Sequence, residues 1–379
     1  MKKLNFSKLL IWVCICIFFQ IFFACAKNET MDFSSLKKIS SLELKYAKLF
    51  SVDYYEGGFK LININNKRQY LVVPENKKAP ENLADNITLI QLPLNNIYLS
   101  STSVMSFFDE LDCLEHIRFS CKKEEDWFLD RPKKYMQDGK IVYAGNYRTP
   151  DYDLLTSGNC QFAIQSTMID QVPQVREKLE DLGISVLIEE SAYENHPLGR
   201  TEWLKLYATL FDKEKLANEI FDEQERLVKT AFINDKTKKS VAFFYFNSKG
   251  GVSVRSKNDY VTKMVELAGG KYIFDEFNID ASSQASVIKL EPEIFYKTAK
   301  DVDFIIYNTY GRKTIYTFEE LLKIDSMMED FKAVKEKKVW VTSPNFYQGS
   351  TEFGTMILDI NKILNEQDEN DIKFFHKLK

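Results

Sequence analysis

Hydrophobic and polar positions along this chain follow two alternating periods: short apolar runs of strand length, then stretches with apolar residues at helical spacing. The longest helical stretch lies between Glu189 and Phe232, where Thr201 and Asp212 predict two helix N-caps and Lys213–Lys229 contains no Gly or Pro. About 17 residues at 1.5 Å each predict a rod of roughly 25 Å. Strand–helix alternations precede and follow this rod. The pattern therefore predicts an α/β protein with two lobes held apart by a helical rod.

Before the rod, residues 46–73 alternate around Gly57-Gly58, which predicts a β-hairpin. Ile87–Leu92 is predicted as the first strand of the first α/β half. Ser100–Ser103 places a cluster of hydroxyl groups at a strand-to-helix junction, where either ligand binding or simple helix capping explains them. Further predicted strands are Ile117–Ser120, Lys140–Gly145, Phe162–Ile164 and Gly183–Ile188, and further helices are Val104–Leu111, Asp151–Ser157 and Val172–Leu182.

The second half repeats this alternation, with Gly269-Gly270 just past a predicted helix, where left-handed residues belong. Its predicted strands are Ser240–Phe246, Phe304–Tyr307 and a last strand at Val339–Val341. Its predicted helices are Asp259–Ala268, Ile288–Ala299, Phe318–Ile324 and Glu352–Leu364.

The first 24 residues are predicted to be a targeting segment, because three lysines precede an apolar run at Leu9–Phe23. The run ends in Phe22-Phe23-Ala24-Cys25, which resembles a bacterial lipobox and predicts lipidation of Cys25 as the first mature residue. A plain signal peptide and a membrane anchor are the alternatives. The run is short for a spanning helix.

Removing those 24 of 379 residues also removes three lysines, which changes the formal net charge from −4 to −7. A mildly acidic chain without a basic stripe argues against nucleic acid as a partner. Cys113, Cys121 and Cys160 remain without metal-ligand spacing, and we expect three buried free thiols. A Cys113–Cys121 disulfide is the alternative.

The sequence does not predict an enzyme. It lacks a Gly-rich phosphate loop, a Gly-x-Ser-x-Gly elbow and a His-Glu-x-x-His motif. Of the three histidines, His196 precedes a proline, where we expect a structural hydrogen bond, and His376 lies in a charged tail. We therefore expect no catalytic residue, no cofactor and no protein-bound metal.

Three segments carry a family resemblance. They are Glu194-Asn195-His196-Pro197-Leu198-Gly199-Arg200-Thr201-Glu202-Trp203, then Gly269-Gly270, and finally Phe331-Lys332-Ala333-Val334-Lys335-Glu336-Lys337-Lys338-Val339-Trp340. Over roughly residues 42–365 the chain resembles the class III, helical-spine substrate-binding lipoproteins of ABC importers that take up iron–siderophores, haem or cobalamin. The first segment looks like the Bacteroidetes branch of that group. The family's Pro-Asp before the third N-lobe strand is replaced here by Cys160-Gln161.

The resemblance implies two Rossmann-like lobes with central, mostly parallel sheets, joined by a long helical spine, with a ligand cleft between them. The implied domains are a signal peptide at 1–24, a lipidated tether at 25–41, an N-terminal lobe at 42–200, a spine at 201–235 and a C-terminal lobe with its C-terminal helix at 236–379. It also implies a monomer in the cell envelope, facing the periplasm. Its implied partners are an ABC permease with its ATPase, a small metal chelate, and the membrane through Cys25.

The resemblance implies that strand-end loops of both lobes line the cleft. Their side chains suit a large ligand with polar edges, because tyrosine offers a flat apolar face with a hydroxyl and arginine pairs with carboxylates. In the N-terminal lobe the candidates for ligand binding are Ser101, Thr102, Tyr147, Arg148, Gln165, Ser166, Glu190 and Tyr193. In the C-terminal lobe they are Tyr245, Asn247, Arg255, Tyr260, Tyr307, Tyr310, Arg312 and Tyr347.

For permease docking, the family's acidic residue on each lobe falls at Asp153 and at Glu291 or Glu293. Solvated helix-terminal carboxylates are the alternative explanation of these acids. The predicted ligand is an iron–siderophore or haem, for which a tyrosine can serve as axial ligand. A corrinoid-binding protein of the same fold and a non-transport envelope lipoprotein are the alternatives.

Overall fold

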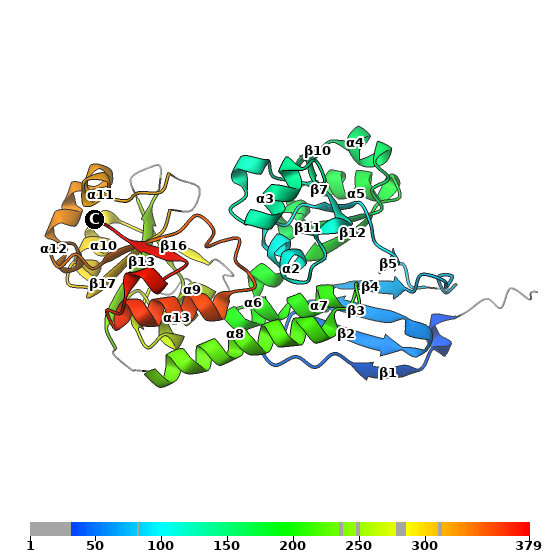
Figure 1. The fold of residues 1–379 in the computed structure, drawn as a ribbon, viewed down its shortest axis with the longest axis horizontal. Helices are drawn as coiled ribbons and strands as arrows, with labels where there is room; N and C mark the ends of the chain where they lie inside the picture. The colour runs from blue at the N-terminus through cyan, green and yellow to red at the C-terminus, as the bar shows by residue number, and fades with distance from the viewer. Residues whose placement is uncertain (1–31, 82, 235–237, 248–250, 278–285, 310–312) are drawn as a thin grey trace, which may run out of the picture.

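A computed structural model describes residues 32–379 except 82, 235–237, 248–250, 278–285 and 310–312. The predicted signal peptide and Cys25 lie outside the described residues. Two lobes of sheets and helices lie side by side above a long helix, α8 (Glu214–Asn234), which runs beneath both (Figure 1). The predicted α/β fold with a helical spine is confirmed. None of the described helices is both long and apolar enough to cross a bilayer.

An N-terminal sheet precedes the parallel sheet of the first lobe. Its strand order is β1-β2-β3-β4-β5, antiparallel except for the parallel pair β4–β5. The hairpin at Gly57-Gly58 is confirmed, and both glycines have positive φ, a conformation that glycine adopts without strain. The strands are β1 (Lys38–Ser41), β2 (Phe50–Tyr55), β3 (Lys60–Ile64), β4 (Arg68–Val73) and β5 (Ile87–Gln91).

The sheet assignment of Ile87–Leu92 was wrong, because β5 pairs with β4 in the N-terminal sheet. The strand that carries Ser100–Ser103 at its end is β6 (Ile97–Leu99), which pairs with β7 and β11 in the parallel sheet. All three residues of β6 are buried, so the strand shows no alternation of polar and apolar positions that sequence inspection could detect.

The parallel sheet of the N-terminal lobe has the strand order β12-β11-β6-β7-β8. Because all of these strands are parallel, their carboxyl ends meet at one edge. The remaining strands are β7 (Ile117–Ser120), β8 (Val142–Tyr143), β11 (Phe162–Ser166) and β12 (Ser185–Glu189), with a small β9–β10 pair (Gly145–Asn146 and Thr149–Pro150). The helices are α2 (Met105–Glu110), α3 (Asp130–Gln137), α4 (Tyr152–Ser157) and α5 (Pro173–Asp181).

The connector between the lobes starts earlier than the sequence predicts. Helix α6 (Pro197–Glu202) places Thr201 inside a helix, and the N-cap is His196, whose Nδ1 accepts a hydrogen bond from Leu198 N at 3.2 Å. Proline at the first helical position suits this start. Helix α7 (Leu204–Ala208) follows, and Asp212 then has a φ of 54°, which is not the extended conformation of an N-cap.

Helix α8 packs against both lobes. Ala217 belongs to the apolar cluster of the N-terminal lobe, together with Trp203 and Tyr207 of α6–α7, whereas Phe221 and Val228 belong to the cluster of the C-terminal lobe. The spine is therefore part of both cores.

A strap, residues 45–49, crosses the connector and is held by two buried glutamates. Glu202 accepts hydrogen bonds from the backbone N–H groups of residues 45, 46 and 47, with distances of 2.9, 2.8 and 2.8 Å. Glu194 accepts those of residues 48 and 49 at 2.9 and 2.8 Å. A Cβ at Gly199 would lie 3.2 Å from the carbonyl oxygen of Tyr46, so a glycine here lets the strap lie close to α6.

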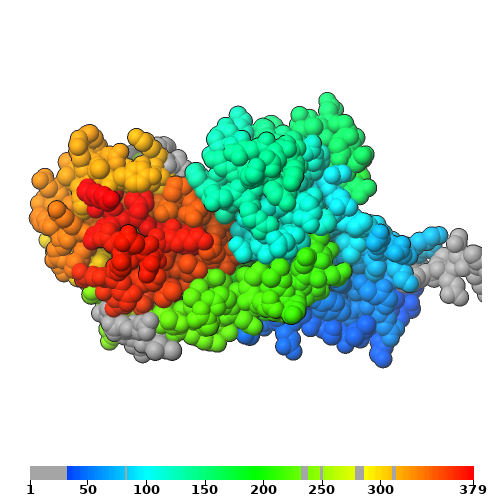
Figure 2. All heavy atoms as spheres, in the orientation of Figure 1, coloured from blue at the N-terminus to red at the C-terminus, as the bar shows by residue number. Residues whose placement is uncertain are grey.

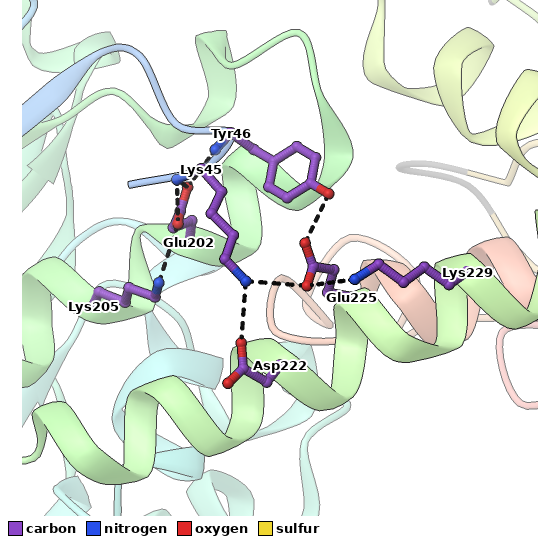
Figure 3. A network of polar contacts seen from close by, with 7 residues as sticks. All are labelled: Lys45, Tyr46, Glu202, Lys205, Asp222, Glu225 and Lys229. Carbon is purple, nitrogen blue, oxygen red and sulfur yellow. Dashed lines mark hydrogen bonds and ion pairs between the residues drawn. The ribbon is translucent and has the colours of Figure 1, made fainter. Parts of the chain in front are cut away.

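Figure 3 shows how the strap also reaches α8. Glu225 accepts from the Tyr46 hydroxyl at 2.9 Å and pairs with Lys45 at 3.1 Å and Lys229 at 3.0 Å. Lys205 pairs with the Glu202 carboxylate at 3.1 Å. The quoted segment Glu194–Trp203 therefore has a structural role, which is to fasten the N-terminal strands to the connector.

The C-terminal lobe is built on a mixed sheet with the order β16-β14-β13-β17-β18-β19, and β15 pairs with β13. Its strands are β13 (Ser240–Phe246), β14 (Val252–Arg255), β15 (Lys271–Tyr272), β16 (Val287–Leu290), β17 (Phe304–Tyr307), β18 (Val339–Thr342) and β19 (Phe375–Lys377). Its helices are α9 (Tyr260–Leu267), α10 (Pro292–Ala299), α11 (Phe318–Ile324), α12 (Lys332–Lys335) and α13 (Phe353–Leu364).

Two predictions for this lobe were wrong. The helix predicted at Ile288–Ala299 is strand β16 followed by α10, and the helix begins at Pro292 because proline fixes φ and lacks an N–H. The last strand is not at Val339–Val341, because β19 pairs antiparallel with β18 and brings His376 of the charged tail into the sheet. The glycine after α9 is confirmed, with a φ of 89° at Gly269.

Candidate ligand-binding site at the junction of the lobes

At the carboxyl edge of the N-terminal parallel sheet, hydroxyl groups converge on one carboxylate. Glu189, at the end of β12, accepts hydrogen bonds from the Ser101 and Ser103 hydroxyls at 2.6 and 3.1 Å and from Ser191 N at 2.8 Å. Ser101 is buried and makes no side-chain cap. The hydroxyl cluster therefore binds the buried Glu189 carboxylate.

The other N-terminal candidates lie on the same edge with different exposure. Gln165 is fully buried, and neither of its side-chain polar atoms has a hydrogen-bond partner among the described residues. The exposed Arg148 donates to the half-buried Tyr147 hydroxyl at 2.7 Å, and the exposed Tyr193 accepts from Thr167 at 3.2 Å. The remaining candidates on this edge, Thr102 and Ser166, are half-buried.

Glu190, the residue after β12, is bound by other groups of its own lobe. Its buried carboxylate pairs with Arg68 of β4 and accepts a hydrogen bond from Asn65 of the β3–β4 turn at 2.7 Å. This carboxylate is used inside the lobe, so we drop Glu190 from the ligand-binding candidates.

An arginine–tyrosine cluster, made of Arg200, Arg255, Asp259, Tyr260 and Tyr347, lies where α6 meets the C-terminal lobe. Arg255 Nη2 donates to the Tyr347 hydroxyl at 2.6 Å, and its Nη1 lies 3.7 Å from an Asp259 carboxylate oxygen. The Arg200 guanidinium lies 3.6 Å from the centroid of the Tyr260 ring, a cation–π contact. Two guanidinium groups are thus placed beside two phenol rings.

Burial sets the protonation of this cluster. It lowers the pKa of Arg200 and raises the pKa of Asp259, and burial also raises the pKa of Tyr347, which stays a neutral phenol. Arg255 is 9% exposed, and its Nε has no hydrogen-bond partner among the described residues. A buried guanidinium with spare donor capacity is suited to an anionic group.

Arg200 was not among the predicted site residues. It comes from α6, and its Nε donates to the carbonyl oxygen of Glu194 at 2.9 Å. The negative charge of Glu189, in the N-terminal lobe, favours the charged form of Arg200 and so acts to raise its pKa. The signal in the sequence was its place inside the quoted segment just before the spine, where a side chain can reach both lobes.

The other C-terminal candidates split into two groups. Tyr245 and Asn247 are half-buried at the end of β13, whereas Tyr307 is buried in the core, with its ring 5.8 Å from that of Phe244. Tyr310 and Arg312 lie outside the described residues.

Three large side chains on N-terminal strand-end loops were missed by sequence inspection. Phe128, Tyr143 and Met168 are 49%, 40% and 41% exposed, and they follow β7, end β8 and follow β11. Exposed large apolar side chains at this edge of the sheet are further candidates for ligand contact. The rule that ligands bind at the carboxyl ends of strands could have found them.

The acidic docking candidates are solvent-exposed. Asp153 lies in the first turn of α4, and Glu291 and Glu293 lie at the N-cap and in the first turn of α10. None of these three carboxylates forms an ion pair with a residue that the structure describes.

The structural role predicted for His196 is confirmed, and the prediction of three buried free thiols is confirmed for Cys113 and Cys160. Burial lowers the pKa of His196 to about 4, so its neutral ring acts as the helix cap described above. Cys113, Cys121 and Cys160 are free thiols, the second only partly buried. Within the described ranges no three His, Cys, Asp or Glu side chains gather as metal ligands would.

With this geometry in view, the chain can be compared with known proteins. The family model described as "Periplasmic binding protein" matches residues 125–345, more than half of the chain. The chain belongs to the periplasmic binding protein family. The resemblance seen in the sequence is thereby confirmed, and the chain's two lobes and spine are those of a binding protein.

Two curated relatives are named as archaeal lipoproteins. One uncharacterized lipoprotein of Methanocaldococcus jannaschii is 27% identical over 358 residues, covering 88% of this chain and 84% of the relative. A second from the same organism is 24% identical over 368 residues, covering 93% and 91%.

Solved structures show the same fold at low identity. The petrobactin-binding protein of Bacillus subtilis matches with a TM-score of 0.58 and 14% identity, covering 88% of this chain and all of that one. The periplasmic heme-binding protein of Vibrio cholerae matches with a TM-score of 0.56 and 14% identity, covering 70% and 97%.

Proposed function

We propose that this periplasmic binding protein is the substrate-binding lipoprotein of an ABC importer and that it captures an iron chelate, a siderophore or haem, between its lobes. The observation that carries the proposal is the arginine–tyrosine cluster at the junction of the lobes. Siderophores and haem present carboxylates or other anionic oxygens beside large flat or apolar surfaces. Guanidinium groups bind such oxygens in a bidentate way, and tyrosine rings cover the apolar part.

The exposed aromatic side chains on the N-terminal strand ends support a large ligand. Phe128, Tyr143 and Tyr193 offer rings to one side of the ligand while Arg255 and Tyr347 offer polar groups to the other. An axial phenolate for ferric haem requires a tyrosine that loses its proton. The raised pKa of Tyr347 disfavours that role, so an exposed tyrosine such as Tyr193 is the better candidate.

The proposal has two further parts. The protein delivers its ligand to a permease with its ATPase, and Cys25 anchors the chain at the periplasmic side of the envelope. Two structural features support docking: Asp153 and the pair Glu291 and Glu293 are exposed carboxylates on separate lobes. The mechanism requires no chemistry, because a ligand that binds the closed lobes better than the open lobes shifts the population toward closure.

The test is a spectroscopic titration of the chain from Ala26 onward, which contains every described residue. Haemin, ferric siderophores and cyanocobalamin are added separately while the melting temperature is followed, because a ligand that binds only the folded state raises it. A Soret shift with stabilisation supports haem, and stabilisation by a ferric siderophore supports a siderophore. Stabilisation by cyanocobalamin alone reassigns the ligand to the corrinoids. No response to any probe overturns the metal-chelate assignment.

A further inference from the structure

Gln348 of the C-terminal lobe makes a two-point contact with the N-terminal lobe. Its side-chain oxygen accepts a hydrogen bond from Phe128 N at 2.8 Å, and its side-chain nitrogen donates to the Asp126 carbonyl oxygen at 2.8 Å. The side chain is 5% exposed. In the space-filling view the two lobes touch above the spine (Figure 2). This amide therefore joins the two lobes.

The N-terminal side of the contact is held by residues of its own lobe. Trp127 is buried, its indole N–H donates to the Ser120 hydroxyl at 3.2 Å, and its backbone is extended. In extended backbone the carbonyl of residue 126 and the N–H of residue 128 point to the same side. They form a donor and acceptor pair that a carboxamide matches.

The C-terminal side is equally fixed. Phe346 is buried against the rings of Phe243 and Phe375, and Gly349 N donates to the Asn345 carbonyl oxygen at 3.1 Å. A Cβ at Gly349 would lie 2.7 Å from the Phe374 ring, so glycine lets the loop pack closely against that ring. Gln348 thus projects from a packed loop toward a packed target.

The same loop carries Tyr347, which receives the hydrogen bond from Arg255 in the arginine–tyrosine cluster. Adjacent residues therefore serve the candidate ligand site and the contact between the lobes. Tyr347 and Gln348 are joined by one peptide unit, so a shift of either residue also moves the other.

We propose that Gln348 is a positioning residue that holds the two lobes at the spacing of this structure and so raises ligand affinity without touching the ligand. The part of this proposal that concerns affinity rests on the proposed function, whereas the contact itself does not. Because the amide bonds only to backbone groups, its strength is independent of the ligand's own chemistry.

The first test measures hydrogen exchange of the Phe128 amide, without ligand, in the chain from Ala26 and in its Gln348→Met variant. Methionine matches glutamine in size but cannot accept from Phe128 N or donate to Asp126. We expect exchange at Phe128 to be at least ~10-fold faster in the variant, because a hydrogen bond protects an amide until it opens. Gln367→Met, at an exposed glutamine of the same lobe, is the matched control and leaves exchange unchanged. Equal exchange at Phe128 in wild type and Gln348→Met overturns the proposal.

Two further measurements keep the result unambiguous. Exchange in β18 reports whether the C-terminal lobe of the variant is folded, and it stays at the wild-type value if only the contact is lost. The dissociation constant is then measured with whichever of haemin and the ferric siderophores binds, and we expect it to rise about 5- to 30-fold, the range for two lost hydrogen bonds. Faster exchange with unchanged affinity also overturns the positioning role. If none of these probes binds, the proposed function fails while the exchange result still decides whether Gln348 holds the lobes together.

Discussion

The connector and the front, the contact of Gln348 with residues 126 and 128, hold the parts of this protein together in different ways. At the connector, Glu194 and Glu202 accept hydrogen bonds from five consecutive backbone N–H groups of the strap. Glu225 adds contacts to Lys45, Tyr46 and Lys229 (Figure 3). At the front, one neutral side chain, Gln348, makes two hydrogen bonds. The difference indicates which contact persists and which one opens. Charged, multiply bonded groups that are fully buried stay formed, whereas two neutral hydrogen bonds can break and reform with each ligand.

The largest effect is expected from Glu202→Ala. This change leaves three strap N–H groups and the Lys205 ammonium without their carboxylate, and Glu202 is fully buried. We expect the free energy of unfolding to fall by about 3–5 kcal/mol, as for other broken buried ion pairs. Urea denaturation followed by tryptophan fluorescence measures it. Glu223→Ala, which removes only an exposed pair with Arg226, is the control and costs less than about 1 kcal/mol. If Glu202→Ala lowers the free energy of unfolding no more than the control does, then Glu202 does not stabilise the connector as described.

Next in size is the effect of Arg255→Met on ligand binding. Removal of one partner from a buried charged hydrogen bond costs about 2–5 kcal/mol, so we expect affinity for the bound probe to fall at least ~30-fold. The titration described above measures the dissociation constant. Arg226→Met, on the outer face of α8, serves as the matched arginine control. Unchanged affinity in Arg255→Met places the ligand away from the arginine–tyrosine cluster.

A smaller effect distinguishes the front from the connector directly. Gln348→Met is expected to lower the free energy of unfolding by only about 1–2 kcal/mol, because two neutral hydrogen bonds are lost and no charge is stranded. The same urea denaturation measures it. If Gln348→Met lowers the free energy of unfolding as much as Glu202→Ala does, the front contributes as much to stability as the connector, and the two do not differ as described.

The smallest effect is a pH dependence at the connector. Hydrogen bonds from Lys229, Lys45 and Tyr46 outweigh the effect of burial and lower the pKa of Glu225 to about 2, against an ordinary value of 4.5. Since the folded pKa is depressed, Glu225 stabilises the fold above pH 4.5, and this stabilisation is lost as pH falls toward 2. Melting temperatures between pH 5 and 2.5 should therefore fall less steeply in Glu225→Gln than in wild type. Glu219→Gln, an exposed acid on the same helix, keeps the wild-type slope, and identical slopes in all three proteins would falsify the role of Glu225.

Elements with a strong local signal were predictable. Strand β13 is a run of apolar residues, and α9 follows its N-cap Asp259 and ends before Gly269. In contrast, β16 and β19 are short strands that pair antiparallel with β14 and β18, which lie far from them in sequence. Short strands of that kind carry too few residues for periodicity to show.

The site followed the same division. The rule that ligands bind at strand ends selected Arg255, Tyr260 and Tyr347, which the structure brings together, but it also selected Tyr307, which packs in the core. The partners of Glu190 and Arg200 decide their roles. Those partners, Arg68 and Tyr260, lie far away in sequence, so no local pattern could identify them.

Helix α8 has a mechanical consequence. Ala217 is fixed in one core and Phe221 in the other, one helical turn or about 6 Å apart, so the described part of the spine contains no free joint between the lobes. Relative rotation of the lobes must bend a continuous hydrogen-bonded rod, which acts as a spring with a restoring torque that grows with angle. Such a spring limits how far the open and closed arrangements of the lobes can differ. A permease that binds both lobes would have to work against the same spring to release the ligand.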